Sequence, residues 1–384
     1  MRILVISQYF WPENFRINEL CKYLSKKNKV TIVTSQPSYP HIQLFKNKKN
    51  IKKYGSIKII RLPTFSRGDS NFSILLNYLS FITVSAIYSI KFIIKSNFEK
   101  VIVFGTSPPS GLILAHIIRI FKKVPINYWI LDLWPETLIS LGFKRDNFFY
   151  QILQKFMNYS YSKCQNIFCQ SKSIKLAVSK KIIDRHRTIY FPSWSENLPT
   201  YKSEKYKKLI SKDNFNIMFT GNVGESQDFE SIIKAANILK KEKKIKWIIV
   251  GTGRYLNKIK LLISKLKLEE NFIFLGHKDQ KYIKYLSSLS DCLLISLKSS
   301  KIFSITVPGK LSNYMQSKKP ILGMINGETK NIIKSANCGY CCSAGDYKML
   351  TKNIYKLKRK SNFQKLKLGM NGYKYCNKFF NKNL

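Results

Sequence analysis

The sequence predicts an α/β protein built as two Rossmann-like domains that face a central cleft. Short apolar runs alternate with amphipathic helical segments along the chain, which is typical of βαβ units and parallel sheets. Several of the apolar runs end in glycine, where a strand turns towards a helix. A polar stretch with two prolines and several lysines, residues 192–212, interrupts the alternation and is typical of a linker.

The linker divides the 384 residues into two domains of ordinary size. We expect an N-terminal domain over 1–195, a C-terminal domain over 213–365, and a C-terminal helix over 366–384 that could pack back on the N-terminal domain. In the first half the pattern predicts strands at 2–7, 30–34, 57–62, 101–104, 125–131 and 166–170, and helices at 14–27, 71–95, 110–121, 148–162 and 172–183.

The alternation restarts after the linker. The pattern predicts strands at 216–220, 246–250, 271–275, 292–297 and 320–324, and helices at 228–240, 254–266, 281–286, 310–316 and towards the C-terminus. Ligands of such sheets bind at the carboxyl ends of the strands, so candidate functional residues are sought there.

The net charge of +46 comes from 67 Lys and Arg against 21 Asp and Glu. It favours an anionic partner: nucleic acid, an acidic membrane surface or a phosphorylated substrate. The alternative is a compositional bias, since Lys, Asn and Ile are all abundant. Because the lysines are dispersed and no nucleic-acid-binding module is recognised, we expect a membrane surface and no nucleic acid.

Residues 74–94 form the most apolar segment, long enough to span a bilayer. Asn77, Lys91 and three serines weaken that reading, so we predict a buried or interfacial helix. The N-terminus reads as a strand and not as a signal peptide. The eight cysteines are scattered and suit a reducing cytoplasm.

Two loops could hold a diphosphate. Gly221, Asn222 and Gly224 lie in a glycine turn between a strand and a helix, where backbone N–H groups can cradle an anion. The second loop, residues 303–310, ends in Pro-Gly-Lys310 before another helix. Together they suggest a nucleotide-activated substrate.

Charge neutralisation in these loops falls to basic side chains, because the sequence holds no Asp-x-Asp pair that could carry a metal. The candidates are Lys310 and Lys298, although both could be ordinary surface lysines. His277, in a strand-end loop, could approach a nucleotide base. The Gly251-x-Gly253 turn lacks the third glycine of a dinucleotide site, since Leu256 stands there, so no cofactor is expected.

Asp132 follows the strand at 125–131, where a carboxylate can orient a sugar hydroxyl or stabilise positive charge at an anomeric carbon. The alternative is a helix cap. His41, on a loop of the same domain, could meet an acceptor. His116 lies in an apolar helix and reads as a core histidine.

The chain resembles the family 4 retaining glycosyltransferases of GT-B fold, and within them the L-fucosamine (N-acetyl-L-fucosaminyl) transferases of O-antigen and capsule assembly. Four stretches carry the resemblance over nearly the whole chain. They are Gln8-Tyr9-Phe10-Trp11-Pro12-Glu13-Asn14-Phe15-Arg16-Ile17-Asn18, Asp132-Leu133-Trp134-Pro135, Gly221-Asn222-Val223-Gly224 with Gln227-Asp228, and Val307-Pro308-Gly309-Lys310 through Tyr314 to Lys319-Pro320.

The resemblance implies a UDP-sugar donor in the C-terminal domain, an acceptor in the N-terminal one, retention of anomeric configuration and no metal. The departing diphosphate would help to deprotonate the acceptor hydroxyl. Arg16 and Asn18 would face the acceptor. Asp132 would stand at the reaction centre.

The sequence departs from the family where two glutamates usually bind the donor. Asn313 stands at the position of the ribose-binding glutamate, and Ile305 at that of the first one. Contacts to the donor sugar would then fall to backbone N–H groups of Ser304, Ile305 and Thr306. The usual basic pair after the glycine turn is replaced by Glu225–Gln227, which shifts phosphate neutralisation towards Lys310.

The family's usual acceptor is a saccharide on a polyprenyl diphosphate at the inner face of the plasma membrane. The resemblance therefore implies a cytoplasmic, peripheral enzyme. We expect the lysine-rich loop 45–53 and the helix at 74–94 to dock on anionic lipid. A UDP-sugar 2-epimerase of the same architecture and, less favoured, a basic nucleic-acid-binding protein remain as alternatives.

Overall fold

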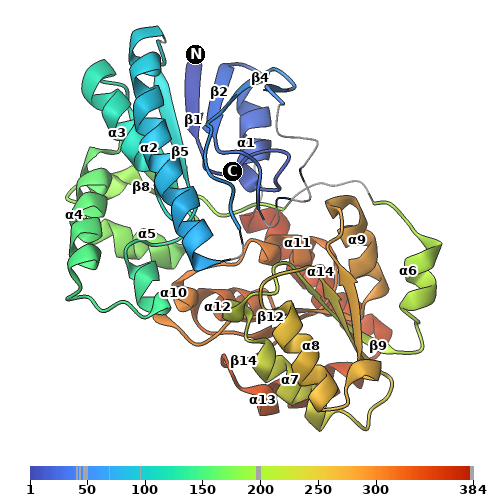
Figure 1. Ribbon diagram of the computed structural model, residues 1–384. Coiled ribbons are helices and arrows are strands. Elements are labelled where there is room, and N and C mark those ends of the chain that lie inside the picture. The colour runs from blue at the N-terminus through green and yellow to red at the C-terminus, as the bar shows by residue number, and fades with distance from the viewer. Residues whose placement is uncertain are drawn as a thin grey trace. The chain divides into compact units, whose positions relative to one another are not determined.

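The computed structural model describes residues 1–39, 42, 45, 51–68, 70–95, 97–195 and 200–380. The chain divides into two compact units, Met1–Phe191 (unit 1) and Pro192–Leu384 (unit 2). Each unit is a sheet of mostly parallel strands covered by helices (Figure 1). The α/β class predicted from the sequence is confirmed in both units.

Unit 1 is built on an eight-stranded sheet of order β3-β4-β2-β1-β5-β6-β7-β8, in which only the β3–β4 pair is antiparallel. The apolar runs become its buried strands, with ends shifted by a residue or two. Two short strands, β3 and β8, were not predicted because neither carries an apolar run. The strands are β1 (Arg2–Ile6), β2 (Lys29–Thr34), β3 (Lys53–Tyr54), β4 (Ile57–Arg61), β5 (Lys100–Gly105), β6 (Ile126–Ile130), β7 (Asn166–Cys169) and β8 (Thr188–Tyr190).

The helices of unit 1 follow the predicted order, and the long helix α2 packs against α3 (Figure 1). The first helix is shorter than predicted, because residues 11–15 form a turn before it. The helices are α1 (Arg16–Leu24), α2 (Asn71–Lys95), α3 (Gly111–Lys122), η2 (Glu136–Leu141), α4 (Phe148–Lys163), α5 (Lys172–Ser179) and η3 (Arg185–Arg187). His116 of α3 is buried and its Nε2 lies 2.9 Å from Ser160 Oγ, as expected of a core histidine.

Unit 2 is built on a six-stranded, fully parallel sheet of order β11-β10-β9-β12-β13-β14. From β9 the chain adds strands towards one edge and then, from β12, towards the other. The strand order therefore reverses between β9 and β12. The strands are β9 (Phe215–Thr220), β10 (Ile245–Val250), β11 (Phe272–Gly276), β12 (Cys292–Ser296), β13 (Ile321–Met324) and β14 (Gly339–Cys342).

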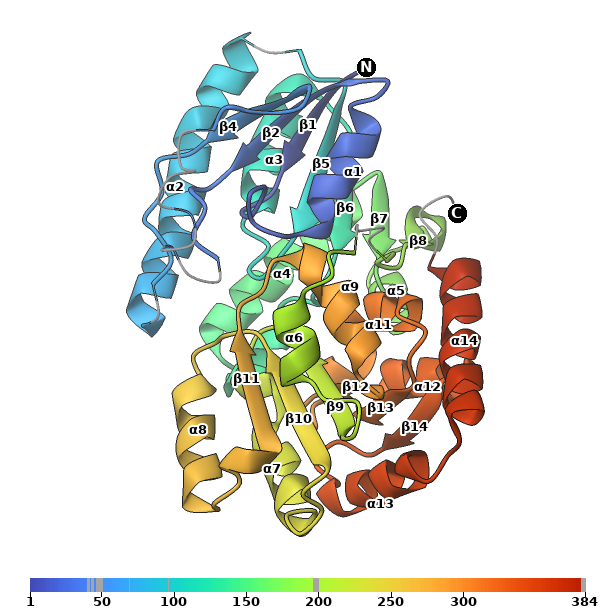
Figure 2. The same ribbon diagram turned by 90° about the vertical axis from the view of Figure 1, so that its right-hand side faces the viewer.

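Helices cover both faces of this sheet (Figure 2). One core gathers side chains of α7 (Phe229–Ile238), α8 (Leu256–Lys265) and α13 (Tyr347–Lys358). The other gathers those of α9 (Gln280–Leu289), α11 (Lys310–Gln316), α12 (Gly327–Ser335) and α14 (Asn362–Phe379). The C-terminal helix α14 packs against α11 of its own unit, with Cys376 and Phe380 buried in that core.

Two segments that read as loops contain helices. The polar stretch 192–212 includes α6 (Glu204–Leu209), and the expected loop 303–310 begins inside α10 (Lys301–Ile305). Side-chain hydroxyls explain the second case. Ser300 accepts a hydrogen bond from the Ile302 amide, and Thr306 Oγ1 donates back to the carbonyl of Ile302.

Candidate active site

The point where the strand order of unit 2 reverses is the expected ligand site of an open α/β sheet. The loop 221–228 leaves the carboxyl end of β9 there, and Lys298 follows the end of β12. Helix α11 is fastened to the same place, because the Tyr314 hydroxyl accepts hydrogen bonds from the amide and the hydroxyl of Thr220 at 2.7 and 3.1 Å. The predicted glycine turn and Lys310 therefore meet at the switch point.

The two glycine turns of unit 2 interlock. The amide of Val223 donates to the Thr252 carbonyl at 2.8 Å, and that of Tyr255 donates back to Val223 at 3.1 Å. A Cβ on Gly251 would lie 1.9 Å from the Gly221 carbonyl oxygen, and the φ of Gly251 is +148°. Only glycine allows this approach. The sequence motif that resembled a dinucleotide turn therefore shapes the neighbouring glycine turn 221–224.

The backbone groups open to an anion differ in part from those predicted. The N–H of Gly221 is used by the Val250 carbonyl at 2.9 Å, because it prolongs the β9–β10 ladder. The N–H groups of Asn222, Gly224 and Glu225 donate to no carbonyl of the described backbone. These three are the donors that the turn presents to a ligand.

Substituting Gly253 tests the interlocked turns. A Cβ at this position would lie 2.3 Å from the Val223 carbonyl oxygen. We expect Gly253→Ala to displace the turn, to cost about 1–3 kcal/mol of unfolding free energy, and to abolish stabilisation by UDP. Thermal melts with and without UDP measure both. Gly309→Ala is the control, since its Cβ would meet open space, and equal melting of the two variants would contradict the prediction.

Lys310 lies beneath the glycine turn. Its Nζ donates to Gln227 Oε1 at 2.9 Å, lies 3.8 Å from the centre of the Phe219 ring, and would be 3.4 Å from a Cβ on Gly221. Burial lowers the pKa of Lys310 to about 7. No carboxylate of the described residues pairs with it. The ammonium is therefore held where an incoming anion would supply its missing counter-charge.

Lys298 has a different environment. Its Nζ forms an ion pair with Glu225 at 2.7 Å, and the hydrogen bond that Lys298 donates to Glu225 raises the pKa of Lys298. Its amide donates to the Ser226 carbonyl, and Ser296 Oγ donates to that of Gln227. Lys298 therefore helps to fasten the loop 221–228 to the end of β12, and its charge is already balanced.

The remaining donor-site candidates lie around this loop. Asn313 is on α11 beside Tyr314, and Asn222 lies within the glycine turn 221–224. His277 follows β11, two strands from β9. Ser304, Ile305 and Thr306 end α10, and the Ser304 amide already donates to Ser300 at 3.0 Å, so a donor contact there would compete with that bond. Their ligand contacts stay predictions.

Gln227 and Asp228 were not proposed as site residues. Gln227 accepts a hydrogen bond from Lys310. Asp228 is buried at the start of α7, and its backbone has a left-handed conformation (φ 51°). Burial raises the pKa of Asp228, against hydrogen bonds from Ser231. In the sequence they stood out only as part of a stretch that carries the resemblance, shortly after the glycine turn.

At the strand ends of unit 1, Asp132 follows β6 as predicted. Its Oδ2 accepts a hydrogen bond from Ser107 Oγ at 2.6 Å, and Ser107 in turn accepts one from Trp134 Nε1 at 3.1 Å. Burial raises the pKa of Asp132. The alternative of a helix cap is wrong, because the following η2 is preceded by Pro135 and has no side-chain cap.

The turn before α1 is built by buried polar groups. Asn18 is buried, accepts from the Trp11 amide and donates to the Glu13 carbonyl, so its amide braces the turn. Glu13 accepts amide hydrogen bonds from Phe10, Ser38 and Tyr39, and burial raises the pKa of Glu13 to about 7. The sequence did not single out Glu13. Arg16 opens α1, half-buried, and His41 lies outside the described residues.

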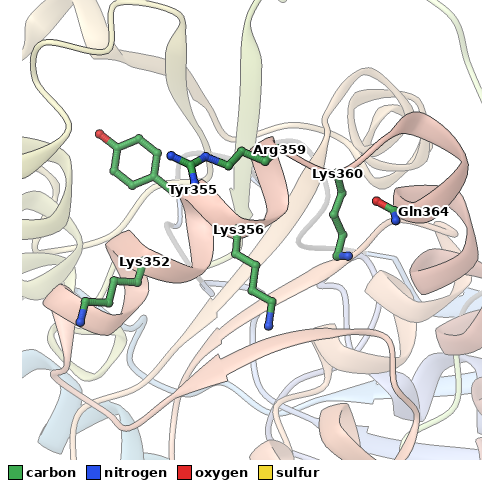
Figure 3. A pocket seen from close by; sticks show the side chains of 6 residues that line it. All are labelled: Lys352, Tyr355, Lys356, Arg359, Lys360 and Gln364. Atoms are coloured by element: carbon green, nitrogen blue, oxygen red, sulfur yellow. The ribbon is translucent and has the colours of Figure 1, made fainter.

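A basic pocket of about 580 Å³ lies on the last turns of α13 and the start of α14 (Figure 3). Since α13 begins past the carboxyl end of β14 and runs back, these turns lie towards the amino ends of the strands. None of the predicted site residues lines the pocket. Within the described residues, no cluster of three His, Cys, Asp or Glu could hold a metal.

The fold and the loops at the strand ends define a class. Two parallel-sheet units of this kind form the GT-B fold, and the chain is a glycosyltransferase. Residues 201–375 match the family model described as glycosyl transferases group 1. The predictions of fold class and of enzyme activity are thereby confirmed.

Two relatives and one solved structure illustrate the similarity. The chain is 23% identical over 309 residues to the probable glycosyltransferase WbjE of Pseudomonas aeruginosa, covering 73% of this chain and 72% of the relative. It is 23% identical over 337 residues to the putative colanic acid biosynthesis glycosyl transferase WcaI of Escherichia coli K12, covering 82% and 81%. The crystal structure of Anabaena Alr3699/HepE with UDP and glucose matches with a TM-score of 0.73 at 14% identity, covering 99% and 96%.

Proposed function

We propose that the protein transfers a sugar from a UDP-sugar to a polyprenyl-diphosphate-linked saccharide in the synthesis of a bacterial surface polysaccharide. The observation that carries the proposal is Lys310, a cation without a described carboxylate partner, beneath a glycine turn at the switch point of unit 2. The UDP bound by HepE and the colanic acid role in the name of WcaI support the donor and the biosynthetic setting.

The donor would bind unit 2. The N–H groups of Asn222, Gly224 and Glu225 would contact its diphosphate, and Lys310 would supply the charge that a metal supplies elsewhere. The amide of Asn313 would bind the ribose. His277 would approach the base, and the end of α10 the sugar.

In unit 1, Asp132 would act at the anomeric carbon, with Arg16 towards the acceptor. Asn18 would support it by bracing the turn before α1. The role of His41, which lies outside the described residues, stays a prediction from the sequence. We propose retention of configuration, with the leaving diphosphate accepting the proton of the acceptor hydroxyl. That route asks for no protein base. N-acetyl-L-fucosamine is the proposed sugar, on the resemblance alone.

The experiment that tests the donor site is a thermal-shift titration with UDP, GDP and dTDP side by side. Saturable stabilisation by UDP alone is the expected result. A preference for GDP would overturn the fucosamine assignment, and no shift with any of them would overturn the donor site. An assay without acceptor separates transfer from epimerisation, since only a 2-epimerase converts a UDP-sugar by itself.

Membrane attachment is proposed for the outer face of α2. Its exposed side carries large apolar residues, while its inward side carries small polar ones. The inward side also holds Phe81 and Phe92, so the helix is apolar on both sides, unlike an ordinary surface helix, whose exposed side is polar. The exposed residues are Phe72, Leu75, Leu79, Ile87, Ile90 and Ile94, named here the α2 stripe, and the buried polar ones are Asn77, Ser80, Ser85 and Ser89.

Helix α2 is long and apolar enough to cross a membrane by length and composition, and 28% of its most apolar window is buried inside the protein. Phe81 and Phe92 anchor it in unit 1. A helix lying in the membrane surface, attracted by the net charge of +46, fits this anchoring. Most of the loop 45–53, the other predicted docking element, lies outside the described residues.

Removing apolar side chains from the α2 stripe should detach the protein from anionic vesicles. We expect Ile87→Ser with Ile90→Ser to weaken vesicle binding by at least about tenfold, because each buried aliphatic side chain contributes about 1.5–3 kcal/mol. Co-sedimentation measures the partition. Leu261→Ser, an exposed leucine of α8, is the control. A wild-type protein that stays in the supernatant would refute the attachment.

A further inference from the structure

Arg67 lies in the segment between β4 and α2 and joins two elements of unit 1. Its Nη1 donates to the hydroxyl of Tyr9, just past β1, at 3.0 Å and to that of Tyr78, on α2, at 2.6 Å. Its guanidinium carbon lies 5.6 Å from the ring centres of both Tyr39 and Tyr78. The cation is thus held among aromatic rings at the carboxyl edge of the sheet.

The charge of Arg67 has no described counter-ion. Its described hydrogen-bond partners are two phenols, and no carboxylate of the described residues forms an ion pair with it. Burial opposes its charge, yet the neighbouring Tyr9 and Tyr78 leave its pKa raised. Two described hydrogen bonds, both from Nη1, occupy only part of its five N–H donors. A half-buried guanidinium in this state is suited to an anion with several oxygens.

The cation is near the proposed reaction centre. The Tyr39 ring packs on Tyr9 and Phe15, with ring centres 5.4 and 5.5 Å apart. The pKa of Tyr39 is raised by burial, lowered by Arg67 and raised by Asp132, so its phenol is within electrostatic reach of both. One aromatic cluster therefore contacts Arg67 and lies within electrostatic reach of the carboxylate that we place at the anomeric carbon.

The cation is also continuous with the α2 stripe. Tyr78, which holds Arg67, precedes Leu79 of that stripe. The segment before Arg67 is fixed to the same turn of α2, because the Phe65 amide donates to Ser80 Oγ and the Phe65 carbonyl accepts from Asn77. Phe65 is itself 65% exposed. An apolar surface and a cation thus adjoin.

We infer that Arg67 binds the diphosphate of the lipid-linked acceptor, and that Leu75, Leu79 and Phe65 contact the first part of its lipid chain. This inference rests on the proposed function, whose acceptor has the two chemical parts that the surface offers: an anionic head and an apolar tail. Held in this way, the sugar at the far side of the diphosphate would extend over the Tyr9–Tyr39 cluster towards Asp132.

The test uses geranylgeranyl diphosphate, inorganic pyrophosphate and geranylgeraniol, each titrated by calorimetry into the full chain with the donor site filled by UDP. We expect the prenyl diphosphate to bind the wild type best, and Arg67→Gln to weaken it by about 10- to 100-fold while leaving geranylgeraniol unaffected. Lys91→Gln, which removes an exposed charge from α2, is the matched control and should bind as the wild type does.

Unchanged binding of the prenyl diphosphate by Arg67→Gln would overturn the inference, as would equal affinities of the wild type for pyrophosphate and the prenyl compound. The UDP thermal shift of Arg67→Gln should equal that of the wild type, which reports a folded chain and an intact donor site. A wild type that lacks this shift would overturn the proposed function, whereas a normal shift without prenyl-diphosphate binding overturns only the role of Arg67.

Discussion

Lys310→Met is expected to weaken UDP binding by about 100-fold, because it removes the charge-assisted contact that we propose between Lys310 and the diphosphate. Methionine keeps the length of the apolar stem over Phe219, so the melting temperature without nucleotide should change little. Thermal shift and calorimetry with UDP measure the two effects. Lys352→Met, an exposed lysine of α13, is the control, and equal UDP affinities in the two variants would remove Lys310 from the donor site.

The pKa of Lys310 predicts how UDP binding depends on pH. Burial lowers the pKa of Lys310 to about 7, and a bound diphosphate would raise it again. UDP binding by the wild type should therefore take up a proton above pH 7 and weaken as the pH rises towards 9. Calorimetry in buffers of different ionisation enthalpy counts the proton. In Lys310→Met the uptake should be absent.

The stability of the nucleotide-free protein also depends on Lys310, but it should rise with pH, whereas UDP binding should weaken. An unfolded lysine keeps its proton to about pH 10.4, whereas folded Lys310 loses it near 7. Between these values the unfolded state binds more protons, so this residue makes the unfolding free energy rise with pH. The slope of stability against pH should therefore be smaller in Lys310→Met than in the wild type.

Asp132→Asn is expected to lower kcat by about 10²–10³-fold and to leave UDP affinity unchanged, because the carboxylate would act only on the charge that develops at the anomeric carbon. Asparagine Oδ1 can still accept the hydrogen bond from Ser107, so the local structure should persist. Steady-state kinetics with a UDP-sugar and a lipid-linked acceptor separate kcat from KM. Asp146→Asn, an exposed carboxylate of unit 1, is the control. A rise in KM alone would make Asp132 a binding group.

Apolar patterning predicted most strands because the central strands of both sheets are buried on both faces, as for Ile3–Ile6 and Phe215–Thr220. It missed β3 and β8, which are short and only half-buried, and α6 and α10, which are too short to show a helical period. Helix α10 begins with a local hydroxyl contact, that of Ser300, which has no periodic signal, whereas α6 begins without a side-chain cap.

The candidate site was predictable where backbone geometry demands a residue type. The glycines at 221, 224, 251 and 253 predicted tight turns between a strand and a helix. Asp132 was predicted from its place directly after a strand. Gln227, Glu13 and Arg67 could not be found in the same way. Each acts through a contact with a residue at least 25 positions away, as Gln227 with Lys310, Glu13 with Ser38 and Arg67 with Tyr9.

The interlocked glycine turns have a consequence for the thermodynamics of nucleotide capture. Because Val223 and residues 252–255 exchange hydrogen bonds in both directions, neither turn can open without breaking its hydrogen bonds to the other. A nucleotide then meets a surface that is already ordered, and little conformational entropy is lost in shaping it. The unfavourable entropy of association is correspondingly small, and the backbone amides of these turns should exchange with solvent deuterium slowly even in the empty enzyme.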